Sequence, residues 1–213
     1  MNVLELFSGT GSVSKCCNEL GWNAVSVDIN GNPTHKCDVL QFNYHQYPKD
    51  YFSIIWASPP CSHYSKLQDS WMGRMRKGQI YTKEIQEQEM KEDDKLVLKT
   101  LEIIEYFKPE LWCIENPDTS RMKTRSMMVD LPYYVIDYCM YSNWGYRKRT
   151  RIWTNKKDWE PKLCNGNCGN MIGKLHQTNL GNQNYKKLTN GHTTTLQERY
   201  RVPPDLIYSL FLD

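Results

Sequence analysis

Three short motifs place side chains of catalytic type at the ends of predicted strands. Cys61 follows an apolar run and two prolines, so a buried strand ends abruptly and presents a thiol at its carboxyl edge. Glu115 follows a second apolar run, and Arg149 and Arg151 lie in a basic segment. Taken singly, each feature also fits a buried cysteine, a strand-end cap or a solvated basic face.

Together these side chains define a reaction on a pyrimidine. A thiolate is a strong nucleophile, and the arginine pair is expected to lower the pKa of the Cys61 thiol. Glu115 can protonate a ring nitrogen while the ring is attacked. Arg149 and Arg151 can hold an exocyclic oxygen and the neighbouring phosphate. Attack on an electron-poor pyrimidine carbon makes the adjacent carbon nucleophilic enough to accept a methyl group.

The methyl donor is predicted from the amino-terminal segment, which reads strand, glycine turn, helix, strand, acid. The run 2–7 leads into Gly9 and Gly11, and a second short strand ends at Asp28. This acid can accept hydrogen bonds from both hydroxyls of a ribose. A dinucleotide-binding loop would carry glycine or alanine where Ser14 stands, which favours S-adenosylmethionine over NAD. A plain strand-to-helix turn is the simpler alternative.

The order of predicted elements favours an α/β fold with a doubly wound, mostly parallel sheet. We expect further strands at 37–40, 133–141 and 150–154, a polar mobile loop running into a helix over 66–95, and an apolar helical stripe over 96–107.

The composition is that of a globular protein. Of the 213 residues, 39% are hydrophobic and 24% charged, and the net charge of +3 is compatible with a polyanionic partner without arguing for one. No window approaches about 18 apolar residues, and no basic leader precedes the first strand. We therefore expect an intracellular, non-secreted protein without a membrane span, a monomer, with its eight cysteines reduced.

In this order the motifs resemble those of the cytosine carbon-5 DNA methyltransferases, in the compact form carried by phages and large DNA viruses. The segment 7–12 resembles the family's methionine-binding loop, and Pro60-Cys61 resembles its nucleophile motif. Glu115-Asn116 resembles the motif that binds and protonates cytosine, and 149–151 the paired-arginine motif. The strings 145–155 and 199–204 look like the phage-type branch in particular.

The resemblance implies a role for each motif residue. The catalytic residues would be Cys61, Glu115, Arg149 and Arg151. The cofactor would contact Phe7, Ser8, Gly9, Thr10, Gly11, Ser12, Asp28, Ile29, Asp38, Val39, Ser58 and Pro59. The substrate would contact Pro60, Ser62, Ser65 and Asn116.

The resemblance further implies an S-adenosylmethionine-dependent methyltransferase (Rossmann-like) fold and a cytosine flipped from duplex DNA, methylated at carbon 5 through a covalent cysteine adduct. Two departures stand out: Ser62 replaces the usual glutamine, and Arg147-Lys148 replaces Pro-Gln. Three alternatives stay open. They are a tRNA-type RNA cytosine methyltransferase, a catalytically silent DNA-binding relative and, weakened by Ser14, a NAD oxidoreductase.

The resemblance also divides the chain. Residues 1–155 would form the catalytic domain, 156–194 a short irregular insertion in place of a target-recognition domain, and 195–213 a helix that packs back on the catalytic domain.

Two further groups of residues have both a functional and an ordinary interpretation. Arg74, Arg76 and Lys77 could close over DNA or could be ordinary charges of a surface loop. Cys164, Cys168, His176 and His192 could form a zinc clip, but their loose spacing favours a free-thiol loop, and no metal is predicted.

Overall fold

The computed structural model describes residues 1–181 and 193–212, and its centre is a seven-stranded sheet. The strands lie in the order β3-β2-β1-β4-β7-β9-β8. Their bounds are β1 (Asn2–Leu6), β2 (Asn23–Asp28), β3 (His35–Lys36), β4 (Ile54–Ala57), β7 (Leu111–Pro117), β8 (Tyr133–Asp137) and β9 (Arg149–Thr154). Strands β1, β2, β3, β4 and β7 pair in parallel, whereas β9 pairs antiparallel with both β7 and β8. The predicted α/β fold class, a mostly parallel and doubly wound sheet, is confirmed.

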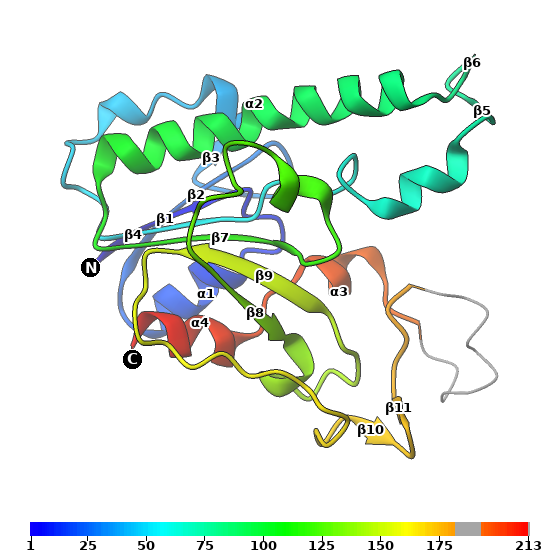
Figure 1. Ribbon diagram of the computed structural model, residues 1–213. Helices are drawn as coiled ribbons and strands as arrows, with labels where there is room; N and C mark the ends of the chain where they lie inside the picture. The colour runs from blue at the N-terminus through cyan, green and yellow to red at the C-terminus, as the bar shows by residue number, and fades with distance from the viewer. Residues whose placement is uncertain (182–192, 213) are drawn as a thin grey trace.

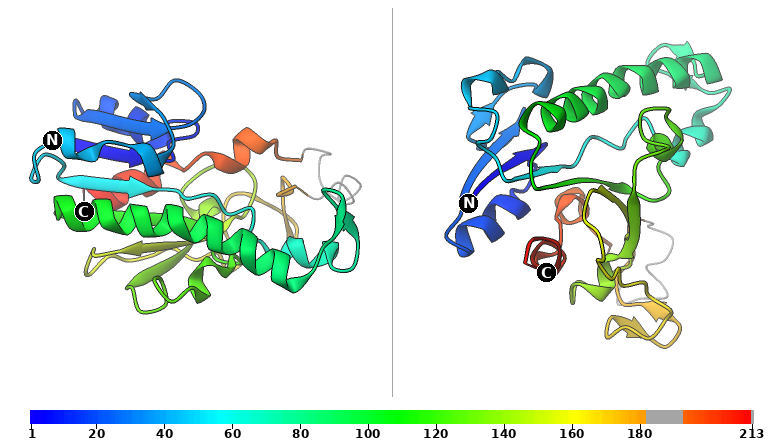
Figure 2. Two further views of the ribbon diagram at one scale, coloured as in Figure 1. Left: turned by 90° about the horizontal axis from the view of Figure 1, so that it is seen from above. Right: turned by 60° about the vertical axis from the view of Figure 1, so that its left-hand side comes forward.

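Helices cover both faces of this sheet (Figure 1). The helices are α1 (Ser12–Glu19), α2 (Lys83–Phe107), α3 (Leu196–Tyr200) and α4 (Pro204–Phe211). Leu4 and Ile55 point into the core under α2, whereas Val3 and Trp56 point into the core under α1 and α4. Because both faces are covered, the central strands are mostly apolar, apart from the buried Glu5 of β1 and the polar carboxyl end of β7. Two further views show α2 on one side of the sheet and α4 on the other (Figure 2).

Helix α2 is longer than the sequence pattern predicts. It begins after Thr82, whose hydroxyl accepts a hydrogen bond from the Ile85 amide at 3.4 Å, and ends at Lys108, which has a left-handed φ of 47°. Its first half buries polar side chains, among them Asp93 and Asp94, so an apolar stripe is hard to detect there. The segment before it holds η3 (Lys66–Trp71) and the hairpin β5 (Met75–Arg76) and β6 (Gln79–Ile80) instead of a plain loop.

Two predicted strands differ from expectation, one being absent and the other shorter. The segment 37–40 is not a strand, because Asp38 accepts a hydrogen bond from the Leu40 amide at 2.9 Å and starts η1 (Val39–Gln41). Strand β8 ends at Asp137, after which η5 (Tyr138–Met140) turns the chain. The remaining elements are η2 (Tyr44–Gln46), η4 (Arg121–Thr124), β10 (Met171–Ile172) and β11 (Leu175–His176).

The last helix packs on the first. Leu206, Ile207 and Leu210 of α4 are buried in the same apolar cluster as Val13 and Cys17 of α1. In the part of the chain that the structure describes, no helix combines the length and apolar character that crossing a bilayer requires.

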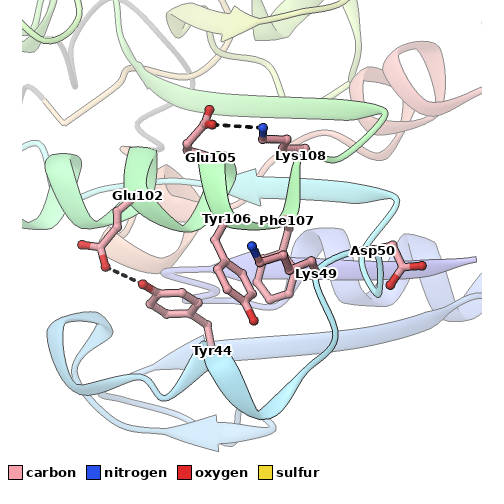
Figure 3. A pocket seen from close by; sticks show the side chains of 8 residues that line it. All are labelled: Tyr44, Lys49, Asp50, Glu102, Glu105, Tyr106, Phe107 and Lys108. Atoms are coloured by element: carbon pink, nitrogen blue, oxygen red, sulfur yellow. Dashed lines mark hydrogen bonds and ion pairs between the residues drawn. The ribbon is translucent and has the colours of Figure 1, made fainter.

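A groove lies at the amino edge of the sheet, beside the end of α2 (Figure 3). The Tyr44 hydroxyl donates to the Glu102 carboxylate across it, and Lys108 pairs with Glu105 at 3.4 Å. Ligands in open α/β sheets bind at the opposite, carboxyl edge. No predicted site residue lines this groove.

Candidate active site at the carboxyl edge of the sheet

The glycine turn after β1 wraps onto the end of β2. Phe7, Gly9 and Gly11 all have positive φ, at 58°, 49° and 68°. The Gly9 amide donates to Asp28 Oδ2 at 2.9 Å, and the Asn30 amide donates to Oδ1 at 2.7 Å. These two bonds fix the orientation of the Asp28 carboxylate, as the predicted role in ribose binding requires.

Ser14 has a structural role that the sequence pattern alone did not indicate. The buried Glu5 accepts hydrogen bonds from the amides of Val13 at 3.1 Å and Ser14 at 2.9 Å, and from the Ser14 hydroxyl. A carboxylate at this place satisfies free amides at the start of α1. Burial raises the pKa of Glu5, and these hydrogen bonds oppose the rise. In the sequence, the role of Glu5 is indicated only by its position as a single acid inside the apolar run 2–7.

The other predicted cofactor residues near this turn differ in how far their side chains are exposed to solvent. Ile29, next to Asp28, is 62% exposed, whereas Val39 is 4% exposed and packs in the core. Asp38 caps η1. Ser58 accepts a hydrogen bond from the Trp56 indole at 2.9 Å, and its amide donates to the Leu6 carbonyl at 3.2 Å, which ties the end of β4 to the end of β1.

Cys61 lies just beyond β4 and is half-buried. The predicted lowering of its pKa by the arginine pair is wrong. Burial raises the pKa of the Cys61 thiol, the Glu115 carboxylate raises it further, and the cation that lowers it is Lys148. The Asn116 amide group donates to the Pro59 carbonyl at 2.9 Å, which holds the nucleophile turn against the end of β7.

Glu115 and Lys148 form a buried ion pair beside this thiol. Lys148 Nζ donates to Glu115 Oε1 at 3.1 Å, and the Tyr138 hydroxyl donates to the same oxygen at 3.0 Å. The Lys148 ammonium also lies 4.7 Å from the centre of the Tyr138 ring and donates to the Arg199 carbonyl at 3.1 Å. Lys148 and Glu115 are only 8% and 6% exposed. Lys148 is therefore a site residue that the motif comparison missed.

The arginine pair faces away from Glu115. In the β7–β9 register Glu115 pairs with Ile152, whereas Asn116 pairs with Arg151, so strand alternation places Arg149 and Arg151 on the Asn116 face. Each arginine is bound by an aspartate and not by Glu115. Arg149 binds the fully buried Asp137 at 2.8 and 3.0 Å, and Arg151 binds Asp118 at 3.0 Å.

Acidic side chains of α2 hold the segment after the nucleophile. His63 Nδ1 lies 3.0 Å from Asp93 Oδ1, and the Tyr64 hydroxyl donates to Asp94 at 2.8 Å. Ser65 caps η3 by accepting from the Leu67 amide at 3.2 Å. Ser62 and Pro60 are exposed at the edge of this segment.

The same helix binds two of the three cations predicted to close over DNA. Arg76 pairs with Glu89 at 2.8 Å, and Lys77 pairs with it at 3.3 Å. Lys77, with a φ of 51°, and Gly78 form the tip of the β5–β6 hairpin. Arg74 is exposed next to them.

A second cluster of reactive side chains lies beyond β8 and β9. Cys164, Cys168 and His176 come together there, joined by Cys139, which the spacing argument did not include. His192 lies outside the described residues. The expectation of a loop with scattered histidines is wrong for His176, because the β10–β11 hairpin returns it to the cysteines.

Comparison with known proteins gives one strong sequence relative. The chain is 40% identical over 223 residues to a protein of Frog virus 3 (isolate Goorha) named "Probable DNA (cytosine-5)-methyltransferase". The alignment covers 99% of this chain and 98% of the viral protein. No family model matches.

Solved structures resemble the fold more distantly. The Entamoeba histolytica methyltransferase EhMeth aligns at a TM-score of 0.48 with 15% identity, over 77% of this chain and 55% of its own. The S. pombe Dnmt2 methyltransferase aligns at a TM-score of 0.43 with 16% identity, over 76% of this chain and 51% of its own. The chain thus spans about half the length of these two structures.

Proposed function

Because this chain belongs to the DNA (cytosine-5)-methyltransferase family, we propose that it transfers a methyl group from S-adenosylmethionine to carbon 5 of cytosine in duplex DNA. One observation carries the residue assignment. Glu115 near the end of β7 and Lys148 just before β9 form a buried ion pair, and both charges act on the Cys61 thiol beyond the end of β4. The glycine turn after the neighbouring β1 lies at the same edge. This is the switch point of the sheet, where β1 lies between β2 and β4.

The residues present fit S-adenosylmethionine, which supplies an electrophilic methyl group when bound. Asp28 is held by two amides with oxygen lone pairs left for ribose hydroxyls. A side chain on Gly9 would meet only the Phe7 carbonyl at 3.9 Å, so the turn leaves room for close approach of a ligand. The exposed Ile29 offers an apolar surface beside the carboxylate.

The chemistry at cytosine falls to Cys61, Glu115 and Lys148. The Cys61 thiolate attacks carbon 6, and the electron density that reaches carbon 5 accepts the methyl group. Loss of the carbon 5 proton to solvent then restores the 5,6 double bond and expels the Cys61 thiolate from carbon 6. Within the described residues both bonds to Glu115 end on Oε1, which leaves Oε2 to carry the proton that it donates to the ring nitrogen of the base during attack. The Lys148 charge stabilises both the thiolate and the carboxylate.

The arginines have a positioning role in this proposal. Arg149 is exposed and Arg151 is partly exposed, and Asp137 and Asp118 fix the orientation of the two guanidinium groups. Both arginines can therefore contact the phosphates that flank a flipped base. We propose that Ser62, Ser65 and Asn116 line the same base pocket.

The domain organisation is part of the proposal. Residues 1–155 form the catalytic domain, and 156–194 stand in place of a target-recognition domain. The described part of 195–213 packs back on the catalytic domain, since α4 packs on α1. The segment that carries Arg74, Arg76 and Lys77 closes over DNA if phosphates replace Glu89 as the partner of Arg76 and Lys77.

Radiolabelled S-adenosylmethionine tests the substrate. We expect labelled 5-methylcytosine in duplex DNA, and none in a matched RNA duplex or in an in-vitro transcribed tRNA. Label in tRNA alone would favour the RNA enzyme. Absence of label from every nucleic acid, with cofactor binding intact by calorimetry, would favour the silent relative.

The Asp28→Asn substitution tests the cofactor site. We expect S-adenosylmethionine affinity to fall roughly 10- to 100-fold, because hydrogen bonds to charged groups contribute about 1.5–3 kcal/mol. Calorimetric titration of the purified protein measures the change, with Asp50→Asn as the matched control at the opposite edge of the sheet. Equal affinities for the two variants would contradict the assignment.

A further inference from the structure

Three cysteines and a histidine outside the proposed active site meet in one compact cluster. The ligand atoms of Cys139, Cys164, Cys168 and His176 all lie within 4.8 Å of one another. His176 Nε2 lies 3.6 Å from Cys164 Sγ and 3.4 Å from Cys168 Sγ. In a tetrahedral zinc site, bonds of about 2.3 Å to sulfur and 2.1 Å to nitrogen put sulfur and nitrogen about 3.6 Å apart. We propose that this chain binds one structural zinc ion through these four side chains.

The donor set favours zinc in a closed, structural role. Three sulfurs and one imidazole nitrogen make a Cys₃His site, which completes a tetrahedron and leaves no position open for water or substrate. Cys139 and Cys164 are buried, and Cys168 and His176 are half-buried. Each thiol loses its proton to solvent as its sulfur binds the metal.

The backbone around the cluster supports negatively charged sulfur. The turn from Cys164 to Cys168 includes Gly166, whose positive φ of 82° lets its amide donate to Cys164 Sγ at 3.4 Å. An amide directed at a thiolate stabilises its charge, as outer-shell donors do in metal sites. The β10–β11 hairpin then reverses the chain and returns His176 to the sulfurs.

Cys139 is joined to the other ligands through Asn170. The Asn170 amide group donates to the carbonyls of Cys139 and Ser142 at 2.8 Å each, and its oxygen accepts from the Gly145 amide at 2.8 Å. Asn170 is 5% exposed and lies two residues after Cys168. It therefore fixes the turn after β8 against the segment that carries the other three ligands.

The cluster replaces a hydrophobic core that this segment lacks. Between β9 and α3 the described residues form only the two-residue strands β10 and β11. Short segments without a core of their own are commonly stabilised by a structural metal. Figure 1 shows the β10–β11 hairpin projecting away from the main sheet.

One buried carboxylate links the cluster to the proposed active site. The Cys164 amide donates to Asp137 Oδ2 at 2.9 Å, and the same carboxylate binds Arg149 at 2.8 and 3.0 Å. Metal binding at Cys164 thus orders the residue that positions Arg149. This link is a consequence of the proposal, and the metal count does not depend on it.

Elemental analysis of the intact purified chain tests the proposal directly. We expect about one zinc per chain in the wild-type protein and less than about a tenth in Cys168→Ser, because three ligands hold zinc much more weakly than four. Cys37→Ser, which changes a half-buried cysteine outside the cluster, is expected to keep its zinc. Equal zinc in Cys168→Ser and Cys37→Ser would overturn the assignment.

A cobalt spectrum provides a second measurement that does not require a folded variant. Wild-type protein stripped with a chelator and titrated with Co²⁺ is expected to show intense tetrahedral bands and thiolate-to-metal charge-transfer absorption. A pale octahedral spectrum, or no uptake of either Zn²⁺ or Co²⁺, would overturn the proposal. Neither readout involves methyl transfer, so both are independent of the proposed enzymatic function.

Discussion

Replacing Cys61 with alanine is expected to abolish methyl transfer while leaving S-adenosylmethionine binding unchanged. Removing a covalent nucleophile costs roughly 10⁴-fold or more in rate, because no other group can form the adduct that activates the base. The measurement is the initial rate of label transfer to duplex DNA, together with calorimetric cofactor affinity. Cys37→Ala is the matched control, since Cys37 is also half-buried and reduced but belongs to no predicted site.

The adduct itself can be trapped. Release of the enzyme requires the hydrogen at carbon 5 to be removed as a proton, and a fluorine in its place cannot be removed in this way. DNA carrying 5-fluorocytosine is therefore expected to remain bound to the wild-type protein and to Cys37→Ala under denaturing electrophoresis. Cys61→Ala is expected to form no such complex. Persistent 5-methylcytosine production by Cys61→Ala would disprove the covalent mechanism.

Lys148→Met is expected to have the second largest effect, on both stability and the pH profile. Breaking a buried ion pair leaves Glu115 with no counter-ion, which costs about 3 kcal/mol in free energy of unfolding. We also expect kcat/KM at neutral pH to fall roughly 100-fold, the order of an acid–base contribution. Arg147→Met is the control, because Arg147 is exposed and adjacent but 3.7 Å from its partner Asp137.

The pH profile separates catalysis from stability in this variant. Burial raises the pKa of Cys61, so below that pKa the thiolate fraction, and with it kcat/KM, rises about tenfold per pH unit. The Lys148 charge lowers the pKa of this thiol, so Lys148→Met raises it and moves the rising limb to higher pH. Lys148→Arg keeps the charge and is expected to keep the limb near its wild-type position. A profile that stays in place for Lys148→Met would show that Lys148 acts through stability alone.

Local patterns were sufficient to predict the core of the fold and the order of the motifs. Cys61 and Glu115 could be placed together because β4 and β7 are apolar runs, and parallel strands end at one edge. Asp28 could be placed near Gly9 because a single βαβ unit connects them. In each case the decisive residues lie at the ends of short, strongly patterned segments.

The environment of the nucleophile could not be predicted in the same way. Lys148 was one of four cations in the segment 147–151, and only its contact with Glu115 in the folded chain distinguishes it from Arg149 and Arg151, which lie on the other face of β9. Cys139 lies 25 residues before Cys164, so no spacing rule includes it in the metal cluster. The loop running into a helix predicted over 66–95 did not fix where α2 begins, because the buried positions of its first half carry acids that bind the nucleophile segment.

The hydrogen bond from Lys148 to the Arg199 carbonyl bears on the biosynthesis of the protein. A similar long-range bond joins the Val202 amide to the Ser12 hydroxyl across 190 positions of sequence. At synthesis rates of about 5–20 residues per second, Ser12 and Val202 emerge roughly 10–40 s apart, whereas Lys148 and Arg199 emerge roughly 2.5–10 s apart. Until then α1 lacks the α4 face that covers it, and Lys148 lacks one acceptor. The nascent chain therefore carries its nucleophile well before the segment that closes the site has been made.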